Sequence, residues 1–239
     1  MSDLPILMSA PMVRAILREI DQPGTGKTQT RRVINPQPVG PLKGGEHLQG
    51  VPGMFRVGDT IWPINFYTSV VSNKPGPHPE WVKEHVKIAI GDRLYVREAW
   101  RVTKALDDVA PRDIDRTTMP EWLATDPNLY AGRKRPGMHL PRWASRITLI
   151  VTDVRVQRLQ EISWEDAEAE GVWHASQEYR EQVCIWRYAP SRLRQLRIEH
   201  FAKLWNSLNA DRGYGWDANS WIAAYTFRPI LGNIDQVRS

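Results

Sequence analysis

The residues best suited to chemistry lie in one short polar segment, Lys27-Thr28-Gln29-Thr30-Arg31-Arg32. A threonine hydroxyl is a weak nucleophile until a neighbouring base takes its proton. A lysine amine can be that base only if burial or nearby positive charge lowers its pKa enough to leave it neutral. Arg31 and Arg32 supply such charge, so Lys27 and Thr30 form a candidate base–nucleophile pair. A basic surface strand is the alternative interpretation.

The spacing of this pair imposes a geometric condition. Side chains alternate along a regular strand, so Lys27 and Thr30 would face opposite sides if both lay within one. They can converge only if the chain turns between them, and the glycines just upstream, Gly24 and Gly26, favour a turn. The sequence therefore predicts a site only on the condition that the chain turns between Lys27 and Thr30.

The same glycines resemble the end of a phosphate-binding loop. The full pattern needs another glycine where this chain has Asp21, and it needs a strand before the loop and a helix after it. The order expected here is the reverse, because residues 11–20 carry an amphipathic helical pattern and the segment after Lys27 is strand-like. We therefore expect no nucleoside triphosphatase site.

Composition narrows the class of protein. The 239 residues are 41% hydrophobic and 25% charged, which is typical of a globular chain and excludes disorder or a coiled coil. The uncharged apolar runs are far shorter than the roughly 20 residues that span a bilayer, so no membrane association is expected. One cysteine, Cys184, excludes a disulfide framework, and the six histidines lack metal-ligand spacing. We expect no metal, no cofactor and, because the first residues lack signal-peptide features, a cytoplasmic location.

Two compositional features point to an anionic partner. The net charge is +5 with a pI near 9.4, and the chain has eleven tryptophans. Two basic clusters, Arg133-Lys134-Arg135 and 192–197, suit contacts with phosphate groups. Their alternative interpretation is a solvated loop and the outer face of a helix.

Strand and helix patterns predict an α+β fold. Strands are expected over Thr30–Ile34, Arg93–Glu98, Ser145–Leu159 and Trp221–Phe227, with a bulge near Thr152-Asp153. Helices are expected over Pro11–Ile20, Ser163–Glu170 and Pro190–Leu208. The first residues of the middle helix form a capping box, and Gly171 is its expected stop.

Three segments, near 36–88, 103–140 and 173–195, interrupt these elements. The segment over 103–140 is polar and rich in proline, so we expect no core of its own there. The chain is thus predicted to be a single domain over 1–239 with long loop insertions.

The arrangement of these motifs resembles the ASCH family. The matching pieces are Gly26–Arg32, Gly91–Glu98, the long strand over 145–159 and the helix ending in Glu170-Gly171. The resemblance covers about half the chain in separated blocks. The sequence around Pro141–Arg146 and Gly213–Asp217 is most similar to that of longer members encoded by phages or prophages. It implies a PUA-like small β-barrel with flanking helices and, for a phage protein, a location in the host cytoplasm.

Small bacterial members of the family are amidohydrolases that remove acetyl from N4-acetylcytidine. The resemblance implies that Lys27 is the proton acceptor, Thr30 the nucleophile and Glu170 the proton donor. Arg32 is expected to hold the oxyanion or ribose hydroxyls. The other residues expected to bind substrate are Thr28, Arg97 and Glu98.

Two other functions stay open from the sequence. One is a module that binds RNA or modified nucleic acid, or a weak RNA nuclease, using the same basic cleft. The other is an interaction protein with an inactive pocket. Binding to long RNA weakens steeply with salt, whereas hydrolysis of a nucleoside barely responds, so salt dependence separates these alternatives. The true substrate and the oligomeric state are left open.

Overall fold

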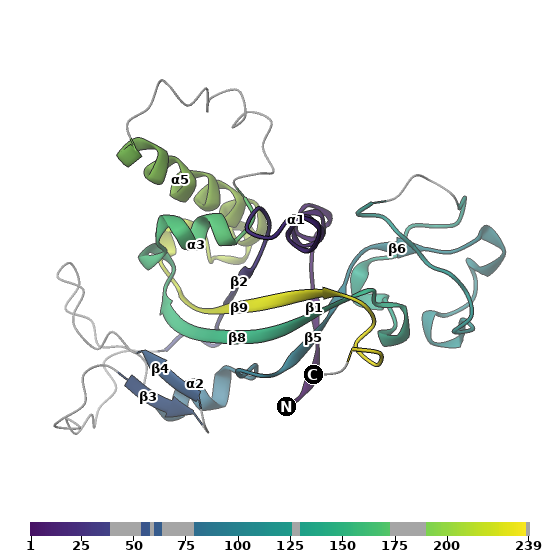
Figure 1. The fold of residues 1–239 in the computed structure, drawn as a ribbon, viewed down its shortest axis with the longest axis horizontal. Coiled ribbons are helices and arrows are strands. Elements are labelled where there is room, and N and C mark those ends of the chain that lie inside the picture. The colour runs from purple at the N-terminus through teal and green to yellow at the C-terminus, as the bar shows by residue number, and fades with distance from the viewer. Residues whose placement is uncertain (39–53, 58–59, 64–78, 126–129, 173–189, 238–239) are drawn as a thin grey trace.

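The computed structural model describes residues 1–38, 54–57, 60–63, 79–125, 130–172 and 190–237. Its centre is a mixed five-stranded sheet in the order β1-β5-β8-β9-β2 (Figure 1). The strands are β1 (Asp3–Leu7), β2 (Gln29–Val33), β5 (Arg93–Arg97), β8 (Ile147–Arg158) and β9 (Trp221–Leu231). β1 is parallel to β5 and the other pairs are antiparallel. The α+β prediction is confirmed.

The long pair β8–β9 forms the middle of the sheet and crosses the centre of Figure 1. Leu149 and Val151 are buried in one phase of β8, whereas Val154 and Val156 are buried in the other. The register shifts between Val151 and Asp153, so one extra residue switches the buried phase. The predicted bulge is confirmed.

Two apolar clusters lie on opposite faces of β9. Ala223 and Tyr225 belong to the main core, which also holds Val13 and Ile16 of α1 (Ala10–Asp21). Ile222 and Ala224 point the other way and pack with residues of α3 (Trp164–Ala169) and α5 (Pro190–Asn209). The alternation of side chains along one strand thus separates the core around α1 from the layer formed by α3 and α5.

The described strands form an open sheet rather than a closed barrel, which differs from the expected barrel. β1 and β2 are its two edges, and no ladder joins them in the described part of the chain. A side chain nevertheless joins the two edges, because the Arg32 guanidinium on β2 donates a hydrogen bond of 2.8 Å to the Leu7 carbonyl oxygen on β1. In a closed barrel, backbone hydrogen bonds would join these two edge strands; here a side-chain hydrogen bond links them.

β1 and α2 (Pro79–His85) are among the elements that the sequence analysis did not predict. β1 contains Pro5, which argues against a strand because proline cannot donate to a ladder. β1 lies at the sheet edge, where that missing donor is tolerated. The short helix α2 (Pro79–His85) was also not expected, and its Val82 is fully buried in the main core.

The prediction that the segment over 103–140 has no core was wrong. It forms a lobe with β6 (Trp100–Arg101) and β7 (Glu121–Trp122), drawn at one end of the sheet in Figure 1. Trp100 is fully buried there in an apolar cluster with, among others, Ile114 and Leu140. The polar sequence hides this core, because some of the charged side chains in the lobe are buried with internal partners. Glu121, for example, pairs with Arg101 at 2.8 Å.

The remaining insertions are only partly described. The hairpin of β3 (Met54–Val57) and β4 (Thr60–Pro63), together with α2, belongs to the segment over 36–88. Most of the segment over 173–195, including Cys184, lies outside the described residues. Among the helices that the structure describes, none is long and apolar enough to cross a membrane.

Candidate functional site

The loop before β2 is wedged between two helices. A Cβ on Gly26 would lie 2.3 Å from the Ala15 carbonyl oxygen in α1, so only glycine fits there. The Lys27 amide donates to that carbonyl at 3.0 Å, and the Thr28 amide donates to the Ala169 carbonyl of α3 at 2.9 Å. These contacts fix the main chain that carries the candidate base.

The same loop is not a phosphate cradle. The Glu19 carboxylate accepts hydrogen bonds from the Gly24 amide at 2.9 Å and from the Gly26 amide at 2.8 Å. A phosphate-binding loop needs such amides free to face the ligand. Because a carboxylate of α1 already occupies them, the structure agrees with the exclusion of a triphosphatase site.

Lys27 and Glu170 form a buried ion pair between residues far apart in sequence. The Lys27 amine lies 2.5 Å from Glu170 Oε2 and 2.9 Å from the Glu170 carbonyl oxygen. Lys27 is fully buried and Glu170 is 4% exposed. Gly171 has a φ of +77°, and a Cβ there would lie 2.9 Å from the Lys27 Cβ. This glycine therefore ends α3 and also makes room for Lys27.

Glu170 is shared with a second cation. Arg31 Nη1 lies 3.0 Å from Glu170 Oε1, and Arg31 Nη2 lies 2.8 Å from Asp166 Oδ2. Asp166 in turn accepts from Arg155 at 2.8 Å. The guanidinium of Arg31 also lies 5.6 Å from the centre of the Phe201 ring. Glu170 is thus held between Lys27 and Arg31 rather than paired with one partner.

The environment lowers the pKa of the Lys27 amine. Desolvation by burial is the main cause, because it disfavours the charged form. Glu170 opposes this effect, whereas the positive charges of Arg32 and Arg31 add to it. The pKa of Lys27 thus shifts in the direction that a lysine base requires.

Thr30 lies beside this pair on the wall of a cavity. It is fully buried on β2, opposite Tyr225 of β9, and its hydroxyl oxygen accepts a hydrogen bond from Arg32 Nη1 at 3.1 Å. The cavity has a volume of about 360 Å³ and lies between β2 and α5. The lining residues that matter for chemistry are Thr30, Arg31, Arg32, Glu170, Phe201 and Trp205.

The structure brings the three predicted catalytic residues together. Thr30 and Glu170 line the same cavity. Lys27 does not line it, but its amine donates a hydrogen bond to the Glu170 carboxylate. Among the hydrogen bonds of the described residues, none joins Lys27 directly to Thr30. β2 begins at Gln29, so Lys27 lies before the strand that carries Thr30. Arg32, which was expected to bind substrate, contacts Thr30 and lines the cavity.

The other residues expected to bind substrate lie elsewhere. Arg97 stacks over the Tyr95 ring at 5.4 Å and donates to the Met138 carbonyl at 3.2 Å, so it ties β5 to the lobe. Glu98 is buried and paired with Arg146 at 2.9 Å, and burial raises the pKa of its carboxyl group. Thr28 is half-buried and does not line the cavity.

Several residues in or next to the cavity were not expected from the sequence. Arg31 was seen only as a source of charge, and Asp166 only as part of a capping box. Phe201 and Trp205 were expected as the apolar side of a helix, and Trp205 is both 5% exposed and part of the cavity wall. Arg212 also lines the cavity, with no pattern in the sequence to indicate it.

The cavity suits a polar ligand with a flat apolar part. Its lining includes two aromatic residues of α5, three arginines and a single carboxylate, that of Glu170. No group of three potential metal ligands occurs among the described residues. No family model, no curated protein and no solved structure matches the chain. The chemistry of this cavity is therefore the basis for assigning a function.

Proposed function

We propose that the chain is an ASCH-type amidohydrolase with a PUA-like fold that removes an acyl group from a modified nucleoside such as N4-acetylcytidine. One observation carries this proposal. A buried lysine with a lowered pKa pairs with Glu170, and the carboxylate of Glu170 lines the same cavity as the buried hydroxyl of Thr30. Base, acid and nucleophile are the groups that acyl transfer from an amide requires.

The first step starts with the proton of the Lys27–Glu170 pair on Glu170, which leaves the Lys27 amine neutral. Thr30 Oγ1 attacks the acetyl carbonyl carbon, and its proton passes to Lys27. The carbonyl π electrons move to oxygen, which becomes a tetrahedral oxyanion. Arg32 already donates to Thr30 Oγ1, so its guanidinium lies beside the attacking oxygen, next to the carbon that carries the oxyanion. Fixed cationic donors at such a point stabilise the transition state without reorganisation.

In the second step, the carbon–nitrogen bond breaks and the cytosine amine leaves with a proton from Glu170. The short contact between Glu170 Oε2 and Lys27 Nζ, 2.5 Å, lets the proton taken by the base return to the acid. Water then hydrolyses the threonine ester, which releases acetate and restores the hydroxyl group. Lys27 and Glu170 thus act as one proton-transfer unit.

The cavity walls fit the nucleoside part of this substrate. Phe201 and Trp205 form part of the cavity wall and give it an apolar side against which a pyrimidine can pack. A volume of about 360 Å³ lies at the lower end of the range for small-molecule sites. A single nucleoside suits this volume better than a larger ligand.

The test compares two threonines that differ in their relation to the cavity. We expect wild type to convert acylated cytidine to cytidine, detected by mass spectrometry on a panel of modified nucleosides. Thr30→Ala should abolish conversion, whereas Thr28→Ala should retain it, because Thr28 does not line the cavity. Circular dichroism checks that both variants fold. Equal activity of Thr30→Ala and wild type contradicts the proposal.

A further inference from the structure

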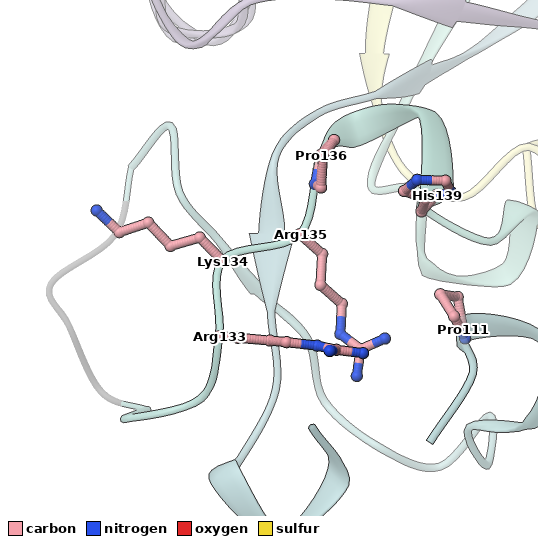
Figure 2. A pocket seen from close by; sticks show the side chains of 6 residues that line it. All are labelled: Pro111, Arg133, Lys134, Arg135, Pro136 and His139. Atoms are coloured by element: carbon pink, nitrogen blue, oxygen red, sulfur yellow. The ribbon is translucent and has the colours of Figure 1, made fainter. Parts of the chain in front are cut away.

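A second cavity of about 360 Å³ lies in the lobe, away from the proposed catalytic residues. Its walls come from one of the basic clusters and from three neighbouring residues (Figure 2). The complete set is Pro111, Arg133, Lys134, Arg135, Pro136 and His139. The cavity therefore combines cationic side chains with two rigid proline walls, and no acidic residue lines it.

Arg135 is built into this cavity. It is 5% exposed, and its guanidinium donates to the carbonyl oxygens of Leu106 at 2.7 Å and Val109 at 3.1 Å. The Trp100 ring centre lies 5.4 Å from the guanidinium carbon. These contacts hold the side chain without neutralising it, and its Nε has no hydrogen-bond partner. A buried guanidinium with neutral partners is a fixed positive charge.

Arg133 places a second positive charge next to the first. Its side chain extends alongside the guanidinium of Arg135 (Figure 2). Burial and this neighbouring charge lower the pKa of Arg135, and Asp107 opposes them. Asp107 Oδ1 accepts from the main-chain amide of Arg133 at 2.8 Å. Two adjacent guanidinium groups repel each other unless an anion lies between or before them.

We propose that Arg133 and Arg135 bind a phosphate group of a single-stranded RNA backbone in this cavity. Arg133 is exposed and supplies donors in the fork geometry that matches phosphate oxygens. Arg135 supplies the fixed positive charge beside it, because both of its Nη atoms already donate to carbonyl oxygens. A ring N–H of His139, on the opposite wall in Figure 2, supplies a further donor. Pro111 and Pro136 leave room beside the phosphate for the attached sugar.

The short distance between residues of the two cavities favours an extended ligand over an isolated phosphate ion. Leu7 lines the first cavity, and a Cβ on Gly137 would lie 2.9 Å from Leu7 Cδ1. Gly137 follows Pro136, which lines the second cavity. Leu7 and Met138 are 53% and 59% exposed, so apolar surface is available between the cavities. A strand held at the second cavity can therefore run toward the first.

The test measures binding of a labelled, unmodified single-stranded RNA of about ten nucleotides by fluorescence anisotropy. No hydrolysis is needed, so the result is independent of the proposed catalytic function. Arg133→Ala should weaken binding about tenfold and reduce the slope of log K against log salt by about 0.7, the loss of one phosphate contact. The matched control is Arg228→Ala, an exposed arginine on β9 that lines neither cavity.

A second arm identifies the source of the phosphate. Inorganic phosphate and the RNA are titrated separately into wild type and Arg133→Ala. The proposal expects RNA to bind far more tightly than inorganic phosphate and only the wild type to show the full salt slope. Equal losses in Arg133→Ala and Arg228→Ala, or binding of inorganic phosphate without RNA binding, would overturn it.

Discussion

Two buried carboxylates, Glu170 and Glu98, are held in different ways. Glu98 receives two hydrogen bonds from one arginine, Arg146, at 2.9 and 3.0 Å, which is a closed bidentate pair. Glu170 instead divides its oxygens between Lys27 and Arg31 and lines a cavity. Sequence motifs gave both residues a role at the site, so the motif alone does not separate them.

The difference lies in which groups can still exchange a proton. An arginine keeps its proton at any ordinary pH, so the Glu98 pair can only hold β5 against β8. The lysine beside Glu170 has a lowered pKa, and its partner has a face open to a ligand. A buried ion pair is therefore a candidate for chemistry when one partner can lose its proton and a cavity adjoins it.

The largest expected effect is on hydrolysis. Lys27→Met removes the base while Arg31 still pairs with Glu170, and we expect a loss of about 10³-fold in kcat/KM. Glu98→Gln, measured in the same assay, should change kcat/KM by less than about threefold, because Glu98 faces its arginine and not the cavity. Comparable losses in the two variants would remove the distinction between the pairs.

The next effect is on stability. Glu98→Ala leaves Arg146 without its bidentate partner and should lower the free energy of unfolding by about 3 kcal/mol. Urea denaturation followed by tryptophan fluorescence measures this loss. The double variant Glu98→Ala/Arg146→Ala should lose less than the sum of the single variants, because no charge is then left unpaired. Strict additivity would show that the pair contributes nothing.

The smallest effect appears at alkaline pH near the cavity. Burial raises the pKa of Tyr225, the cross-strand neighbour of Thr30, to about 12. The unfolded chain loses this proton near pH 10, so the contribution of neutral Tyr225 is complete below pH 10 and is lost as pH rises toward about 12. The shift corresponds to about 2–3 kcal/mol.

Tyr225→Phe tests this directly. Lys27 acts in the opposite direction, because its lowered pKa makes the folded state gain stability as pH rises toward 10.5. The difference between wild type and Tyr225→Phe isolates the tyrosine. Urea unfolding at about pH 9 and about pH 12 should show a smaller alkaline loss in the variant. Identical losses would place the ionisation elsewhere.

Local patterns predicted what local interactions decide. Ser163 caps α3, the bulge in β8 follows from a change of apolar phase, and Gly171 ends its helix as expected. The contact between Lys27 and Glu170 joins residues distant in sequence, so spacing could not reveal it, and only the family resemblance placed them together. Spacing likewise could not show that Arg146 takes Glu98 away from the site.

The lobe shows a second limit. Its arginines look like a solvated surface in sequence, yet Arg101 and Arg135 are buried against a carboxylate or carbonyl oxygens. Charged residues lower the apparent hydrophobicity of a segment even when they are internally satisfied. The core around Trp100 was therefore hidden by the side chains that complete it.

The hydrogen bond from Arg32 to Leu7 has a consequence for aggregation. Unpaired strand edges are templates on which other molecules can add a strand, and this is a common route to aggregation. Arg32 links the two edges of this sheet, β1 and β2, through a hydrogen bond of 2.8 Å from its guanidinium to the Leu7 carbonyl oxygen. Loss of the guanidinium would leave the edges β1 and β2 free to pair with strands of neighbouring molecules. The side chain that we propose to stabilise the oxyanion therefore also protects the two sheet edges.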